Sequence, residues 1–150
     1  MNFNVHIGAA ISIIVMVAII VFMDWIPTPL NRNIEGMSTR ERLPSTIIHS
    51  TIGLGFATSN LLTIKWLIFI GAIWFSIILI AAIRNWWVAY FAGQYPGEIT
   101  PEIYSQHYSQ NLRIMPPFKG NPVIPDIQHM LIHLAVLIAS LFLWWSFWLA

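Results

Sequence analysis

Three long runs of apolar residues dominate the chain. They cover residues 7–23, 66–83 and 130–150, and no Lys, Arg, Asp or Glu interrupts them. A helix needs about 20 mostly apolar residues to cross the hydrocarbon layer of a membrane, so each run predicts a membrane-spanning helix. The first run has no Lys or Arg before it and no small-x-small cleavage pattern after it. We therefore expect it to remain in the mature protein as a helix.

A fourth segment, residues 44–62, is long enough to cross a membrane but is only weakly apolar. Gly53 and Ala57 lie four residues apart, and so do Gly55 and Ser59. This spacing of small residues lets two helix backbones approach closely in lipid. The pattern therefore predicts a fourth spanning helix that is buried among the other three.

The ends of this fourth segment carry local signals. Pro44 suits the first turn of a helix, because the N–H group that proline lacks has no partner there in any case. Ser59 and Asn60 favour a tight reversal of the chain before the next apolar run. We therefore expect the helix to cover residues 44–62 and the chain to reverse before Trp66.

The basic residues favour four spans over three. Lys and Arg accumulate in the cytoplasmic loops of membrane proteins. With four spans, six of the seven Lys and Arg residues face one side and only Lys65 faces the other, whereas three spans divide them four against three. We therefore predict both termini outside. The expected order is a helix at 7–26, a cytoplasmic loop at 27–43, helices at 44–62 and 65–91, a Pro-rich cytoplasmic loop at 92–124 and a helix at 125–150.

Composition supports this assignment and excludes other classes. The 150 residues are 57% apolar and 9% charged, whereas roughly a quarter of a soluble protein is charged. Thirteen charges with a net charge of +1 do not suit a secreted enzyme, a nucleic-acid-binding protein or a disordered tail. The chain contains no cysteine, which excludes disulfides and thiolate metal sites. The predicted fold class is a single all-α membrane domain, residues 1–150, built as a four-helix bundle.

The long cytoplasmic loop contains one short helix and a stiff segment. Thr100 can cap a helix, Pro101 fits its first position, and Glu102 favours its first turn. Residues 115–125 contain four prolines and cannot be helical, so we expect an extended strap across the membrane surface.

A cluster of polar residues lies at the cytoplasmic end of the predicted bundle. Asp126, His129 and His133 stand at steps of three and four, which place them on one face of the last helix. In the four-span arrangement His49 of the second helix lies at a similar depth, and Asp24 ends the first helix on the same side. Ionisable residues within a membrane usually face the bundle interior and mark a functional site.

Imidazole and carboxylate groups together suit a divalent transition metal such as zinc, iron, manganese or copper. We therefore predict a metal site with His49, His129, His133 and Asp126 as ligands. Asp126 and Asp24 are the candidate catalytic carboxylates, as a base or as a support for an imidazole. A reaction at this site would act on a lipid-soluble or interfacial substrate.

Several alternatives explain the same residues without a metal. Asp126 can cap the last helix, and His49 can bond to a neighbouring helix. Haem b could be held between His49 and either His129 or His133. The chain can also be a non-catalytic accessory or assembly subunit of a larger membrane complex, or a homo-oligomer, since its small-residue face suits helix docking. We expect His6 and His107 to be solvated.

Two stretches carry motifs: RNWWVAYFAG at residues 84–93 and NLRIMPPFKGNPVIPDIQHMLIH at residues 111–133. They resemble a group of small bacterial four-helix membrane proteins with a WWxxYxxG stretch and a Pro-rich loop that leads into PxxxHxxxH. The resemblance covers about the C-terminal half of the chain. It implies a location in the bacterial inner membrane and the same number of helices, and it implies no activity.

Overall fold

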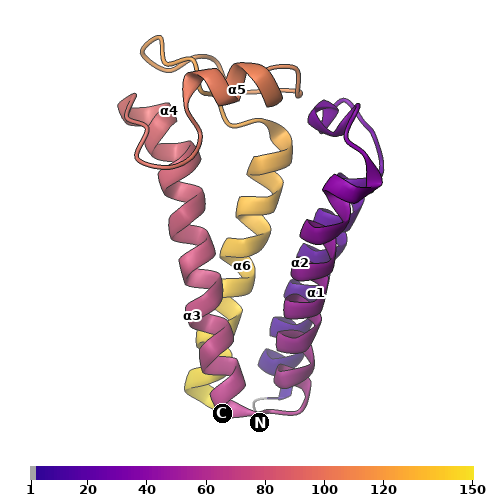
Figure 1. Ribbon diagram of the computed structural model, residues 1–150. Coiled ribbons are helices and arrows are strands. Elements are labelled where there is room, and N and C mark those ends of the chain that lie inside the picture. Colours follow the sequence, from indigo (N-terminus) through magenta and orange to yellow (C-terminus); the bar gives the residue numbers. More distant parts are fainter. Residues whose placement is uncertain (1–2) are drawn as a thin grey trace.

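The structure, a computed structural model, describes residues 3–150 and is all-helical within them. Four long helices lie side by side; α1 begins and α6 ends at one end of the bundle, and the longer connecting segments gather at the other (Figure 1). The elements are α1 (Phe3–Trp25), the 3₁₀ helix η1 (Arg32–Ile34), α2 (Thr39–Leu61), α3 (Lys65–Ala82), the π-helix η2 (Ile83–Trp87), α4 (Val88–Ala92), α5 (Pro101–His107) and α6 (Ile127–Leu149).

Three stretches of helix within the described residues are long and apolar enough to cross a membrane. They are Asn4–Trp25, Lys65–Ala92 and Ile127–Leu149, and they contain the three apolar runs of the sequence, except that the last run extends one residue further, to Ala150. The helix α2 is as long as α1, at 23 residues, but it is less apolar. The fold and composition together indicate an all-helical membrane protein.

The helix α2 begins five residues before the predicted start. Ser38 precedes it, and the backbone N–H of Ser38 donates to the Glu41 carboxylate at 2.7 Å. This capping box satisfies donors at the start of a helix, so it outweighs the signal from Pro44, which lies inside the helix. The carbonyl that Pro44 leaves without a partner belongs to Arg40, which is exposed, so water can bond to it.

The helix α2 ends at Leu61, one residue before the predicted end at residue 62, but the predicted reversal at Ser59 and Asn60 is wrong. Both residues are helical and buried, and the hydroxyl of Ser59 and the amide of Asn60 each donate to the carbonyl of Phe56, at 2.8 and 2.9 Å. The chain instead turns at Thr63, which adopts a positive φ of 52°. Because Ser and Asn can bond back to their own helix as readily as they can form a turn, their presence did not fix the boundary.

The core forms along α1 and α6. The helix α1 packs against α2 on one side and α6 on the other, and α6 also packs against α3 (Figure 1). Gly53 allows the close approach of α2 to α1, since a Cβ atom there would lie 2.5 Å from a methyl group of Val17. Gly53 and Ala57 are therefore the docking pair that their spacing predicts, whereas Gly55 faces outward. The largest fully buried side chains of this core are Ile13, Ile68, Phe75, Val136 and Leu143.

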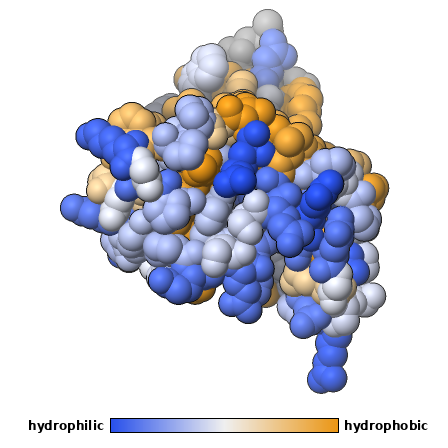
Figure 2. Space-filling view, turned by 90° about the horizontal axis from the view of Figure 1, so that it is seen from above, coloured by the Kyte–Doolittle hydropathy of each residue, from blue (hydrophilic) through white to orange (hydrophobic). Residues whose placement is uncertain are grey.

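The segments 26–38 and 93–126 form what we call the polar cap, at the end of the bundle opposite the start of α1. Viewed from that end, the surface is mainly hydrophilic, with apolar side chains at its margins (Figure 2). The short helix α5 lies in the cap, and the Thr100 hydroxyl accepts a hydrogen bond from the N–H of Ile103, as the Thr-Pro-Glu pattern predicts. The cap positions the start of α6, where the predicted site lies.

Candidate functional site at the polar cap

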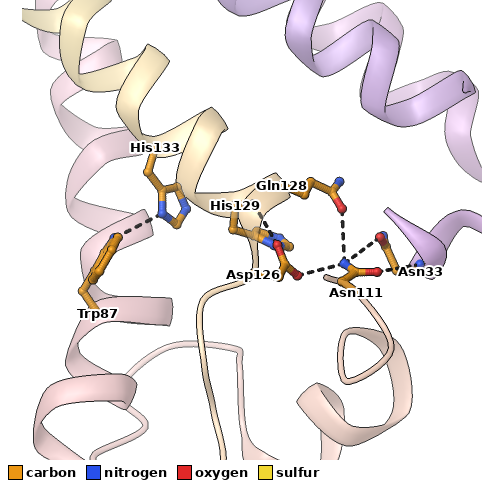
Figure 3. A network of polar contacts seen from close by, with 7 residues as sticks. All are labelled: Asn33, Trp87, Asn111, Asp126, Gln128, His129 and His133. Carbon is orange, nitrogen blue, oxygen red and sulfur yellow. Dashed lines mark hydrogen bonds and ion pairs between the residues drawn. The ribbon is translucent and has the colours of Figure 1, made fainter. Parts of the chain in front are cut away.

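Asn111 is the centre of a buried hydrogen-bond network in the polar cap (Figure 3). Its amide nitrogen donates to Asp126 Oδ2 at 2.8 Å, to Asn33 Oδ1 at 3.0 Å and to Gln128 Oε1 at 3.3 Å. Its carbonyl oxygen accepts from the backbone N–H of Asn33 at 3.0 Å. Beside it, the backbone N–H of Leu112 donates a hydrogen bond to the carbonyl of Pro29. One side chain thus joins the loop after α1 to the start of α6.

Asp126 caps α6 and orients His129. Its side chain is fully buried, and Oδ1 accepts from the backbone N–H of His129 at 2.9 Å and from the ring Nδ1 at 2.8 Å. The carboxylate therefore assigns the Nδ1–H tautomer to His129 and leaves Nε2 with its lone pair. Asp126 performs the capping role that its sequence position allows, and it also fixes an imidazole.

Aromatic rings enclose His129. The ring of Trp86 lies over it with centroids 3.8 Å apart, and the ring of Tyr108 meets it edge-on at 5.0 Å. Burial raises the pKa of Tyr108, and the nearby Asp126 carboxylate raises it further. Burial likewise raises the pKa of Tyr104, which packs against Trp86, while a hydrogen bond from Arg113 lowers it. Apart from the Asp126 carboxylate, the groups that enclose His129 are therefore aromatic rings.

His133 lies one turn deeper and bonds to a different element. The indole N–H of Trp87 donates to His133 Nδ1 at 3.2 Å (Figure 3). A ring that accepts at Nδ1 carries its proton on Nε2, so His133 is neutral and presents an N–H at Nε2. Metal binding at Nε2 would move this proton to Nδ1, where it would face the indole N–H. The Trp87 contact therefore opposes metal ligation by His133.

His49 and Asp24 have neighbours of their own. His49 Nδ1 lies 2.8 Å from the carbonyl of Ser45 on the same helix, and the ring borders a small cavity of about 40 Å³ with Trp74 and Phe75 of α3. Asp24 accepts a hydrogen bond from the hydroxyl of Thr46 at 2.7 Å, and this hydroxyl also accepts from the indole of Trp25. Asp24 thus ties the end of α1 to α2.

The structure brings together some of the predicted site residues and separates others. Asp126, His129 and His133 share one face of α6, and the rings of His129 and His133 have centroids 6.0 Å apart. Asp24 bonds to Thr46 and His49 to Ser45, both on α2, and neither makes a hydrogen bond or ring contact with the three α6 residues within residues 3–150. Within residues 3–150, the structure contains no group of three His, Cys, Asp or Glu side chains that is arranged to hold a metal ion.

Two polar clusters are not predicted from the sequence. No local signal marks Asn111, because its partner Asn33 lies 78 residues away. The prediction that His6 is solvated is wrong, because His6 is only 5% exposed and its Nδ1 lies 2.5 Å from the hydroxyl of Ser146. That hydroxyl donates to Asn60 Oδ1 at 2.7 Å, so His6 donates from Nδ1. The chain of bonds joins α1, α6 and α2 at the end opposite the polar cap. His107, by contrast, is exposed as predicted.

Comparisons with protein-family models, curated proteins and solved structures find no match for this chain. Its class, an all-helical membrane protein with a polar cap at one end, follows from its own residues and their arrangement.

Proposed function

We propose that the chain is a four-span inner-membrane protein that serves as a non-catalytic subunit of a larger membrane complex. One observation carries the proposal: the side chains best suited to chemistry are already engaged in contacts within the protein. Asp24 joins α1 to α2, Asp126 and His129 organise the polar cap, and His133 bonds to Trp87. Polar residues that hold the helices and the polar cap in place suit a structural subunit, because such a subunit needs a defined shape and no free reactive group.

Packing and charge support four spans with both termini outside. The weakly apolar helix α2 lies along α1 and buries Gly53, Ala57, Ser59 and Asn60, and the buried side chains of Ser59 and Asn60 have partners within the protein. Basic residues gather at the polar-cap end, which is the cytoplasmic end by the distribution rule for Lys and Arg. They are Arg32, Arg40, Arg42, Arg84, Arg113 and Lys119, with Lys65 at the other end.

The polar cap also offers a surface that suits a protein partner. It exposes side chains of both signs, namely Arg32, Glu35, Glu98, Glu102, Arg113 and Lys119. A mixed surface of this kind favours a partner with complementary charges over nucleic acid, which needs a predominantly basic patch.

A metal site at His129 is the second candidate, and one contact favours it. A carboxylate that accepts from one imidazole nitrogen, as Asp126 does from His129 Nδ1, orients the other nitrogen toward a metal ion in many metalloproteins. Further ligands would have to come from outside the network around Asn111.

One preparation tests both candidates. The chain is purified in lipid nanodiscs from the membranes of its own cells, and its mass and metal content are measured. We expect a partner at a fixed ratio, less than a tenth of an equivalent of metal, and loss of the partner in a Glu98→Lys and Glu102→Lys double variant. Lys65→Glu, a charge reversal at the opposite end, is the matched control and should retain the partner.

Two results would contradict the subunit proposal. A lone chain with stoichiometric metal that is lost in His129→Ala would favour the metal site instead. A lone chain without metal would leave neither candidate standing.

A further inference from the structure

An apolar groove of about 600 Å³ opens on the side of the bundle between α3 and α6. Aliphatic side chains form its walls, among them Leu79 and Ile83 on one side and Leu134 and Leu137 on the other. Ile83, Leu134 and Leu137 are exposed, so the groove faces outward, toward the lipid around a spanning helix. Trp87 and His133 also line it. Its volume is within the range of small-molecule sites in proteins, roughly 300–1,000 Å³.

The groove contains one polar group whose role as a hydrogen-bond donor is defined, the ring of His133. The hydrogen bond from Trp87 to Nδ1 places the proton of His133 on Nε2. The residue His133 is only 9% exposed, and its Nε2 has no hydrogen-bond partner among the described residues. Trp87 has a single N–H, which it gives to His133. The groove therefore offers one hydrogen-bond donor, and no Lys, Arg, Asp or Glu lines it.

The depth of this donor determines which molecules can satisfy it. His133 lies six residues into α6, about 9 Å along the axis from Ile127. In a hydrocarbon layer about 30 Å thick, this depth is below the lipid headgroups, among acyl chains that offer no acceptor. An N–H without an acceptor is costly in such surroundings. A ligand that brings an oxygen acceptor to this depth would remove that cost.

We propose that the groove binds a lipid-soluble quinone, with a ring carbonyl that accepts from His133 Nε2–H. The quinone ring is flat and apolar enough to lie between aliphatic walls beside the indole of Trp87, and its isoprenoid tail can leave through the open side into the lipid. A quinone carbonyl is a neutral acceptor located within the hydrocarbon layer. A fatty acid would instead bring a carboxylate into a groove without a cation. The proposal concerns binding and goes beyond the role of the chain as a subunit.

The test uses the full chain in phosphatidylcholine nanodiscs with decylubiquinone as the ligand. Quenching of tryptophan fluorescence gives the affinity, and labelling with ¹⁵N-histidine shows the Nε2–H signal of His133. We expect saturation at one quinone per chain and a shift of that signal alone. Decylbenzene, which has a ring and a tail but no carbonyl, should not compete.

Variants locate the site. His133→Leu removes the donor and should weaken binding at least tenfold, whereas His49→Leu, the same change on α2, should leave affinity within twofold. Equal affinity in His133→Leu, or equal competition by decylbenzene, would overturn the proposal.

If His133→Leu does not fold, Leu137→Trp tests the binding site instead. It fills the groove from an exposed position and leaves the bond between Trp87 and His133 in place. Loss of quinone binding, with the Nε2–H signal retained, supports the site, and unchanged binding overturns it. Neither result depends on whether the chain has a protein partner.

Discussion

The indole ring of Trp86 lies over the imidazole ring of His129, with the centroids 3.8 Å apart and the planes 30° from parallel. The next residue, Trp87, donates a hydrogen bond to His133, one turn further along α6. Two successive tryptophans therefore contact two histidines that are four residues apart. Both tryptophans belong to the π-helix η2, a wide turn of the kind that often occurs at functional sites. This arrangement links the polar cap, through Trp86, to the lipid-facing groove, through Trp87.

The first prediction concerns Asn111. Asn111→Ala removes the amide that bonds to Asp126, Asn33 and Gln128 and leaves buried polar groups without a partner. We expect a loss of about 2–4 kcal/mol in the free energy of unfolding. Unfolding in detergent, followed by circular dichroism, measures this change. Gln110→Ala, at the exposed neighbouring residue, should change the free energy by less than about 0.5 kcal/mol. Equal stability of the two variants would contradict a central role for Asn111.

The second prediction concerns alkaline pH. Burial raises the pKa of Tyr104 and Tyr108 above the ordinary value of about 10. Above pH 10 the unfolded chain therefore loses these protons before the folded chain does, and stability falls as the pH rises from about 10 through the folded pKa values. The melting temperature should decrease over this range. Tyr108→Phe should make the decrease smaller, and an unchanged slope in that variant would show that Tyr108 is not its source.

The sequence predicts the local features of this fold and fails where distant residues meet. The three apolar runs and the Thr100 cap are local signals, and each corresponds to a helix in the structure. The start of α2 is also encoded locally, by Ser38 and Glu41, whose capping box outweighs the signal from Pro44. Asn111 is different, because nothing near it in sequence reveals a partner at Asn33. Long-range polar contacts of this kind depend on how the helices pack.

In the candidate site, too, local features are predicted from the sequence and long-range contacts are not. Helical spacing correctly places Asp126, His129 and His133 on one face of α6. Spacing does not reveal which nitrogen of each ring is free, since that depends on Asp126 for His129 and on Trp87 for His133. The spacing predicts His133 as a metal ligand, whereas its hydrogen bond with Trp87 makes it a hydrogen-bond donor at Nε2. That contact joins residues 46 positions apart in the sequence.

The third prediction concerns the buried cluster at the end opposite the polar cap. Ser146→Ala would leave the N–H of His6 and the carbonyl of Asn60 without their shared partner. We expect a loss of about 1–2 kcal/mol in the free energy of unfolding in detergent. Ser12→Ala is the matched control, because the Ser12 hydroxyl donates only to the carbonyl of Ala9 on its own helix. A double-mutant cycle with Asn60→Ala should show coupling, and additive effects would contradict the bond between Ser146 and Asn60.

The fourth prediction concerns the path of α2 through the membrane. The chain has no cysteine, so Thr39→Cys and Thr63→Cys each introduce a single reactive thiol. Thr39 begins α2 at the polar-cap end, and Thr63 forms the turn at the other end. If α2 spans the membrane, a membrane-impermeant maleimide added outside intact cells labels Thr63→Cys, and Thr39→Cys reacts only after the membrane is opened. Ala72→Cys, fully buried in α3, should not react under either condition. Labelling of both threonine positions from the same side would mean that α2 does not cross, and the chain would then have three spans, with its termini on opposite sides.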